Sequence, residues 1–289
     1  MESKLRFNRG LSDEFVTELM SGRLAPLLVT SANAGLDVQI RENYLSFYYD
    51  GLSVLALSEH AALPRYRARI HRKYLDGIVL PDALALAGDY RRFHATGQFV
   101  GAYTEHVPAI LSTAQPYAGP EAVVEQMMIR ASHGGASPVV FIDRQVQMHG
   151  VRKKADLVGL TAEGQFVLTE MKRGLDNRIQ HLMDQIREYH AVLAGSDGCL
   201  REEVARSYRK VVEQKQSLGL LPGSVRFSDS QVRVTCLLVL YGYNPRSELL
   251  TRLRQASAAH SIPVDLVMLP EGSYTLPPMA AWDRLCPTQ

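Results

Sequence analysis

The first hundred residues combine short β-favouring runs with polar turns, a pattern that predicts a small α+β region. Residues 44–49 and 53–57 are two such runs, and the Asp50-Gly51 pair lies between them. An Asp-Gly pair with β-favouring residues on both sides indicates a hairpin turn. Ser12 is a candidate helix N-cap ahead of the hairpin. Three apolar residues follow it at helical spacing, Phe15, Leu19 and Met20. We therefore expect a helix followed by antiparallel strands.

The pattern changes after residue 120, where strand-like apolar runs alternate with amphipathic helical segments. Pro120 is suited to the first position of a helix, and apolar residues follow it at 3.6-residue spacing. The turn at 162–164 indicates a second hairpin. Strands are expected at 139–146, 154–160, 166–171, 232–241 and 264–269, and helices at 120–131, 179–193, 202–216 and 246–258. Strands with helices on both sides predict a buried sheet of mixed strand direction.

A segment rich in proline separates the two regions. Three prolines and a glycine between residues 108 and 120 interrupt any periodic pattern. We place an N-terminal α+β accessory domain at 1–108, a linker at 109–119 and a second domain at 120–289. A chain of 289 residues agrees with two domains of ordinary size.

Composition and charge narrow the class of protein without identifying a function. Hydrophobic residues make up 46% of the chain and the net charge is +2, which excludes a polybasic or wholly disordered protein. The three cysteines are widely spaced, so neither a disulfide framework nor a zinc finger is indicated. No apolar run approaches the roughly 18 residues of a membrane helix, and the polar start has no signal-peptide pattern. We expect a cytoplasmic protein with no membrane partner.

Three charged residues on the two strands of the second hairpin indicate a chemical function. Asp156 lies in an otherwise apolar run, and Glu170 and Lys172 lie two residues apart after the turn. Side chains alternate along a strand, so Glu170 and Lys172 share a face, and strand pairing brings Asp156 towards Glu170. Neighbouring carboxylates repel each other unless a positive charge lies between them, and Mg²⁺ binds such oxygens. The pattern favours metal-assisted hydrolysis of a phosphodiester; a surface ion pair is the alternative for Glu170 and Lys172 alone.

The same residues resemble the motif of a known superfamily. Asp156, a gap of thirteen residues and then Glu170-Met171-Lys172 look like the D-x(n)-(D/E)-x-K signature of PD-(D/E)XK nucleases. Gln185 and Tyr189, one helical turn apart, are similar to the Q-x-x-x-Y element of the exonuclease-like branch. The resemblance covers about residues 121–269 and implies an α/β (α+β) fold, a restriction-endonuclease-like αβββαβ core with a central mixed sheet. It does not reach the N-terminal region, and no proline directly precedes Asp156.

The resemblance implies a role for each residue of the motif. Asp156 and Glu170 would bind Mg²⁺ or Mn²⁺, with the main-chain carbonyl of Met171 as a further ligand. Lys172 would orient the attacking water and stabilise the charge that develops on the phosphate. Two residues of the following helix would support the site or contact the substrate backbone, Gln185 and Tyr189.

A third acidic ligand is expected from the helix that precedes the three strands. Many members of the superfamily carry such a residue, and Glu125 stands at that position. Glu121 lies one helical turn earlier and is the alternative. A solvated helix position is the competing interpretation of Glu125.

Two groups of basic residues are candidate nucleic-acid contacts. The first group flanks the motif and consists of Lys153, Lys154 and Arg173. The second lies between residues 65 and 73 and includes Arg67 and Arg72, with Tyr66 and Tyr74 as stacking surfaces. A solvated helix or loop face is the alternative for the second group. Both groups would bind phosphate through their positive charge.

These observations favour a Mg²⁺- or Mn²⁺-dependent deoxyribonuclease that acts in repair, restriction or defence against mobile DNA. RNA stays open as a substrate, as does the choice between endonuclease and exonuclease cleavage. One alternative is a nuclease fold that binds nucleic acid or assembles a complex without catalysis. Another is an RNA-cleaving effector that a ligand of the N-terminal domain activates. The N-terminal domain is also a candidate homodimer interface.

Overall fold

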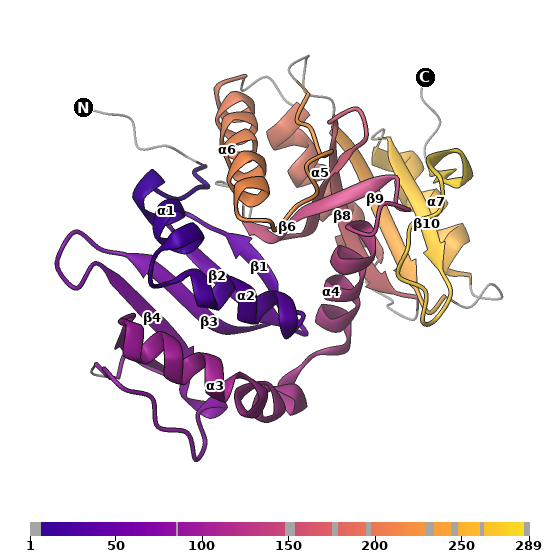
Figure 1. The fold of residues 1–289 in the computed structure, drawn as a ribbon. Helices are drawn as coiled ribbons and strands as arrows, with labels where there is room; N and C mark the ends of the chain where they lie inside the picture. The colour runs from indigo at the N-terminus through magenta and orange to yellow at the C-terminus, as the bar shows by residue number, and fades with distance from the viewer. Residues whose placement is uncertain are drawn as a thin grey trace. The chain divides into compact units, whose positions relative to one another are not determined.

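The chain forms two compact units that each contain a sheet and helices (Figure 1). The computed structural model describes residues 7–84, 86–147, 154–174, 179–194, 198–228, 234–243, 248–260 and 263–285. The N-terminal unit comprises the described residues of 9–126 and 213–222, and the C-terminal unit comprises those of 127–212 and 223–289 together with Phe7 and Asn8. These described residues form seven α-helices and two sheets, which confirms the mixed α+β class.

The N-terminal unit is built on a five-stranded antiparallel sheet within its described residues. Its helices are α1 (Asp13–Ser21), α2 (Ala25–Asn33) and α3 (Gly97–Ala114), and its strands are β1 (Asp37–Ile40), β2 (Tyr44–Tyr49), β3 (Leu52–Glu59), β4 (Tyr66–His71) and β5 (Tyr90–His94). The strands pair in their sequence order. One face of the sheet is apolar and buried, with Leu55, Leu57 and Phe93 fully inaccessible to solvent.

The predicted N-terminal hairpin and helix are confirmed. Asp50 and Gly51 have φ angles of 46° and 80°, as the left-handed positions of a tight hairpin turn require. The Ser12 side chain accepts a hydrogen bond from the backbone of Phe15 at the start of α1. Phe15 is buried, but Met20 is 55% exposed, because it lies beside rather than within the buried stripe of α1.

The basic segment between residues 65 and 73 forms a strand and a short 3-10 turn rather than a helix or loop face. Strand β4 buries Tyr66 and Ala68 on one face, while Arg67 and Arg69 alternate with them. The 3-10 turn η1 (Arg72–Tyr74) follows directly. The period-two alternation of apolar and basic residues was the signal of a strand in this segment.

The structure corrects the prediction of a linker at 109–119. Helix α3 continues through Pro108 to Ala114 and is followed by the 3-10 turn η2 (Gln115–Tyr117). Val107, Ile110 and Ala114 are buried in the N-terminal unit, and their burial outweighs the backbone hydrogen bond that a proline removes. The division between the units falls instead after Gln126, within α4 (Pro120–Ser132).

The C-terminal unit is built on a mixed sheet whose described strands number six. Its strands are β6 (Val139–Gln147), β7 (Lys154–Thr161), β8 (Phe166–Arg173), β9 (Val234–Tyr241), β10 (Val264–Leu269) and β11 (Asp283–Arg284). Its helices include α5 (Ile179–Ala194), α7 (Leu249–His260) and α6 (Gly198–Ser217), of which residues 213–217 belong to the N-terminal unit. The sheet order is β11-β10-β9-β8-β7-β6. Strands β6, β7 and β8 pair antiparallel, whereas β8, β9 and β10 pair parallel. The predicted mixed sheet is therefore confirmed.

Strand β8 occupies the point where antiparallel pairing changes to parallel pairing. Helices α5 and α7 cover one face of this part of the sheet, where Met183 and Ile186 pack against Leu238 of β9 and Leu253 of α7. This buried cluster anchors α5 beside β8. The residues of α5 that follow Met183 are consequently fixed close to the end of β8.

A tight turn at Gly164 joins β7 to β8 and holds their register. Gly164 has a φ angle of +75°, and a Cβ atom there would lie 2.4 Å from the backbone nitrogen of Ser228. We expect Gly164→Ala to lower the free energy of unfolding by about 3 kcal/mol, because backbone strain and a steric clash add. Gly135→Ala is the matched control, since Gly135 has a φ angle of +82° but no atom lies within 4 Å of the place that a Cβ would occupy.

Urea denaturation of both variants measures this difference. The control carries only the backbone penalty, about 1 kcal/mol. Equal losses of stability in the two variants would show that the contact with Ser228 adds nothing to the turn.

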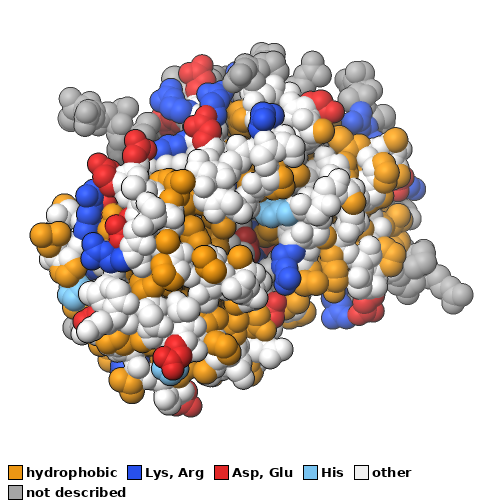
Figure 2. Space-filling view, viewed as in Figure 1, with side chains coloured by type: hydrophobic (Ala, Val, Ile, Leu, Met, Phe, Trp, Pro, Cys, Tyr) orange, Lys and Arg blue, Asp and Glu red, His pale blue; other side chains and the backbone are white. Residues whose placement is uncertain are grey.

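The surface shows no large-scale separation of charge on the face drawn in Figure 2. Lys and Arg side chains are interspersed there with Asp and Glu and with hydrophobic side chains. Within the described residues, no helix is both long enough and apolar enough to cross a bilayer. The expected cytoplasmic location and the expected homodimer stay predictions.

Candidate active site

The three charged residues of the motif meet at one end of the β7–β8 pair. The last paired residues of the two strands are Leu157 and Thr169, so Asp156 and Glu170 lie opposite each other one position further on. Asp156 is 8% exposed and Glu170 is 2% exposed. Two carboxyl groups that share a buried position repel each other when both are ionised.

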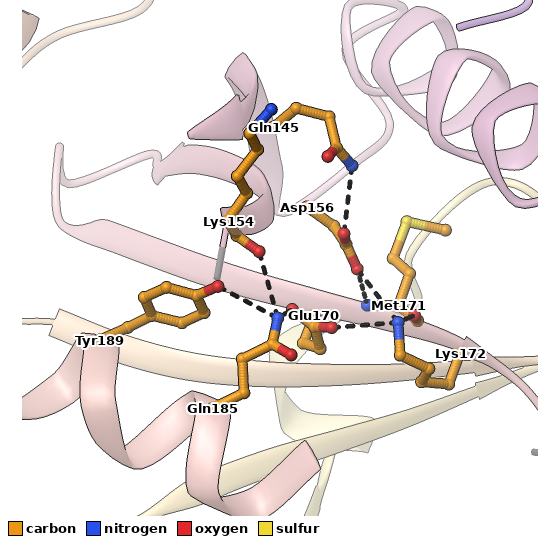
Figure 3. Close-up of polar contacts among 8 residues, drawn as sticks. All are labelled: Gln145, Lys154, Asp156, Glu170, Met171, Lys172, Gln185 and Tyr189. Atoms are coloured by element: carbon orange, nitrogen blue, oxygen red, sulfur yellow. Dashed lines mark hydrogen bonds and ion pairs between the residues drawn. The ribbon is translucent and has the colours of Figure 1, made fainter. Parts of the chain in front are cut away.

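The Lys172 ammonium lies between these acidic groups (Figure 3). Its Nζ atom is 3.0 Å from Glu170 Oε1 and 3.7 Å from Asp156 Oδ2. The same atom donates a 2.7 Å hydrogen bond to the backbone carbonyl of Met171. Three oxygens from two strands thus converge on a single cationic point. They are the three oxygens that the superfamily resemblance assigns to a metal ion.

Asp156 is held in place from both sides. Its Oδ2 atom accepts a 2.9 Å hydrogen bond from the Met171 backbone, and its Oδ1 atom accepts a 3.1 Å bond from Gln145 Nε2. The carboxylate takes the Met171 N–H at the point where the pairing of β7 with β8 ends. The orientation of the Asp156 carboxylate is therefore fixed by β6 and β8 together.

Glu170 is held by helix α5. Gln185 Nε2 lies 2.6 Å from Glu170 Oε2, 3.1 Å from the Lys154 carbonyl oxygen and 3.0 Å from the Tyr189 hydroxyl (Figure 3). An amide nitrogen has two hydrogens, so it donates to two of these three oxygens at a time. Gln185 and Tyr189 are both buried. The Q-x-x-x-Y pair therefore connects α5, β7 and β8 around one carboxyl group.

The buried environment changes the acidity of the site. Burial, reinforced by the Asp156 carboxylate, raises the pKa of Glu170 to about 9 against the opposing effect of Lys172. Burial also raises the pKa of Tyr189, and the Glu170 carboxyl adds to this shift. At neutral pH Glu170 consequently retains a proton when no other cation is bound. Since a carboxyl group binds a metal in its deprotonated form, metal binding here would release a proton.

The donor set suits a hard divalent cation. It consists of two carboxyl groups and one main-chain carbonyl, and Mg²⁺ typically takes one or two protein carboxylates and completes its shell with water and substrate oxygens. In the part of the chain that the structure describes, no three side chains of the carboxylate, imidazole or thiolate type are grouped as a metal site. The Lys172 ammonium occupies the point on which these oxygens converge.

The other predicted ligand, Glu125, is buried at 2% exposure in α4. It is assigned to the N-terminal unit, whose boundary follows one residue later. Its assignment as a third acidic ligand stays a prediction.

The basic residues expected around the site differ in their surroundings. Lys153 lies outside the described residues, whereas Lys154 and Arg173 are exposed at neighbouring strand ends of the C-terminal unit. In the N-terminal unit, Arg67 lines a cavity on the sheet and Arg72 forms a 3.1 Å ion pair with Asp89. Their contact with nucleic acid stays a prediction.

Gln145 is a member of the site that the sequence did not reveal. It falls between the paired residues Arg144 and Val146 of β6, opposite Asp156. Its φ angle of 49° is left-handed, which is uncommon for a residue other than glycine and costs about 1 kcal/mol or more. A glutamine in a polar stretch of a strand carries no signal of this geometry. The residue with this strained backbone, Gln145, is also the one whose side-chain amide donates a hydrogen bond to the Asp156 carboxylate.

Comparison of the chain with protein-family models, with curated proteins and with solved structures found no match. The interpretation of the site therefore depends on the geometry of its own residues. That geometry joins two buried carboxyl groups, a lysine and two supporting amides at one end of a mixed sheet.

Proposed function

We propose that the protein is a divalent-metal-dependent nuclease that hydrolyses phosphodiester bonds of DNA. The observation that carries the proposal is the convergence of Asp156 Oδ2, Glu170 Oε1 and the Met171 carbonyl on one cationic nitrogen at 2.7 to 3.7 Å. Such a set of hard oxygens suits Mg²⁺ or Mn²⁺ and leaves room in the coordination shell for substrate.

The order of elements in the C-terminal unit supports the same proposal. Helix α4, strands β6 to β8, helix α5, the added helix α6 and strand β9 follow one another along the chain. Apart from α6, this is the order that the αβββαβ core of PD-(D/E)XK nucleases would require. The candidate site lies where the antiparallel part of the sheet meets the parallel part. We therefore propose a restriction-endonuclease-like core for this unit.

Each residue of the site would have a distinct role. A divalent cation held by the three oxygens would supply Lewis acidity at the phosphoryl group. The Lys172 amine would hold the attacking water and balance the negative charge that develops on the phosphate. Gln145 and Gln185 fix the two carboxyl groups, so the site would need little rearrangement during the reaction.

Two exposed cations next to the site would bind the substrate backbone. Lys154 begins β7 and Arg173 ends β8, so both lie at the end of the strands where the carboxyl groups meet. Their positive charge would attract the phosphates on either side of the cleaved bond.

A cleavage assay tests the proposed function. Labelled single-stranded DNA, double-stranded DNA and RNA are incubated with the full chain in Mg²⁺, in Mn²⁺ or in EDTA. We expect DNA cleavage that needs the metal and that Asp156→Ala reduces by at least about 100-fold. Glu202→Ala, which removes an exposed carboxylate of α6, serves as the control and should cleave like the unmodified chain.

Three results would contradict the proposal. Cleavage in EDTA would exclude a metal requirement, and full activity of Asp156→Ala would exclude this site. Salt-sensitive DNA binding without cleavage under any condition would favour the non-catalytic alternative.

A further inference from the structure

The sheet of the N-terminal unit has a second face that is polar and basic. Its apolar face buries Leu57, Ala68 and Phe93. Side chains alternate along a strand, so the residues next to these in sequence project from the opposite face. Arg67, Arg69 and Arg92 lie on this opposite face, which also bears a cavity of about 320 Å³.

Strand register brings the three arginines together. Arg69 pairs directly with Arg92 across β4 and β5, and Arg67 lies two residues before Arg69 on the same face of β4. Ser58 of β3 is the cross-strand partner of Arg67. The three arginines, from two neighbouring strands, therefore line the cavity together with Tyr44, Ser58 and His60.

The positive charge of these three arginines is not balanced by any acidic side chain in the described part of the chain. No acidic residue lines the cavity, and across the described ranges of the chain Arg67, Arg69 and Arg92 take part in no ion pair. The buried Nε atom of Arg67 has no hydrogen-bond partner among the residues that the structure describes. By contrast, Arg65 and Arg72 of the same segment pair with Glu59 and Asp89. Like charges that face each other across a sheet destabilise it.

Two contacts of the arginines affect the charge and the geometry of the cavity, one with His60 and one with Tyr90. Burial lowers the pKa of His60, and the positive charges of Arg67 and Arg92 lower it further, so the imidazole is neutral at physiological pH. The Arg69 guanidinium lies 4.8 Å from the ring centroid of Tyr90, and such stacking restricts its orientation. The arginines are consequently held near one another without a neutralising partner.

We propose that this cavity, lined by Arg67, Arg69 and Arg92, binds the terminal phosphate of a nucleotide or of a nucleic-acid strand end. Arginine forms paired hydrogen bonds with phosphate oxygens, and a phosphate monoester carries up to two negative charges against the three positive ones here. A phosphodiester within a strand carries only one charge and fits this excess less well. The cavity volume of about 320 Å³ is at the lower end of the range for small-molecule sites. The proposal is independent of the nuclease function of the C-terminal unit.

Isothermal titration of the full chain in EDTA tests this binding. The probes are AMP, adenosine, and thymidine octamers with either a 5′-phosphate or a 5′-hydroxyl end. We expect AMP and the 5′-phosphorylated octamer to bind more tightly than the two probes without a terminal phosphate. Arg69→Ala and Arg92→Ala should each weaken binding of AMP by about tenfold or more.

Arg91→Ala is the matched control. Arg91 lies next to Arg92 on β5, so its side chain projects from the opposite face of the sheet. This control should bind AMP like the unmodified chain. The variants of Arg69 and Arg92 should keep or raise the unfolding temperature without ligand, because each relieves repulsion. AMP binding that neither variant changes would overturn the proposal. Equal binding of the two octamers would do the same and would indicate a contact with internal phosphates.

If only the 5′-phosphorylated octamer binds, the site recognises a strand end. If AMP binds as tightly as that octamer, the phosphate of a free nucleotide is sufficient. Both results support recognition of a terminal phosphate and distinguish the source of the group.

Discussion

Replacement of Lys172 by methionine is expected to lower the proposed DNA cleavage by at least about 100-fold, while divalent metal binding persists or becomes tighter. The ammonium lies 2.7 Å from the Met171 carbonyl and 3.0 Å from Glu170 Oε1, where a metal would need the same oxygens. A second cation at this point repels the first. Removal of the ammonium therefore removes a competitor of the metal, and it also removes the group that would hold the attacking water.

The two effects are measured separately. We expect the cleavage rate of Lys172→Met to fall by about 10² to 10⁴-fold, the range for loss of a positioned proton donor or acceptor. Titration of Mn²⁺ reports the affinity of the metal. Lys210→Met, which removes an exposed ammonium from α6, controls for a change of net charge. A variant that cleaves normally would contradict the assigned role of Lys172, and one with weaker Mn²⁺ binding would contradict the competition.

The stability of the metal-free protein is expected to fall as the pH rises from about 4.5 to about 9, through the titration of Glu170. Its ordinary pKa of 4.5 applies to the unfolded chain, and burial and Asp156 raise the pKa in the folded chain to about 9. Below pH 4.5 the group is protonated in both states, and its contribution to stability is fully present. Between these values only the folded state holds the proton, so rising pH favours unfolding by about 1 kcal/mol per pH unit.

Glu170→Gln isolates this contribution, since glutamine is neutral and similar in shape. Chemical denaturation of both proteins in EDTA between pH 4 and pH 10 gives two stability curves. The difference between them should grow in favour of the variant as pH rises, and should level off above about pH 9. Parallel curves would show that Glu170 titrates at its ordinary pKa in the folded chain.

The central part of the candidate site could be predicted because its geometry is local. Asp156 and Glu170 are separated by one hairpin, and the alternation of side chains along each strand decides which of them share a face. Gln185 and Tyr189 are one helical turn apart. The structure brings all four together with Lys172. Periodicity was enough for Asp156, Glu170 and Lys172, whereas the place of Gln185 and Tyr189 beside them was expected from the superfamily resemblance.

Other parts depended on contacts that periodicity does not encode. Gln145 contacts Asp156 from a position on β6 where its own backbone has a left-handed conformation. The helix through Pro108 persists because its apolar face is buried in the N-terminal unit. In both cases a tertiary contact outweighs a local conformational preference.

The sequence by itself determined the strand and helix order of the C-terminal unit and the residues of its acidic motif. Only the tertiary structure decided that the basic segment around Arg67 forms an open sheet face, and that Arg92 from a separate strand joins it. The physical reason is the difference between local and long-range information. The alternation of side chains along one strand can be recognised in that strand's own residues. The register between strands more than twenty residues apart is set by the burial of the opposite apolar face.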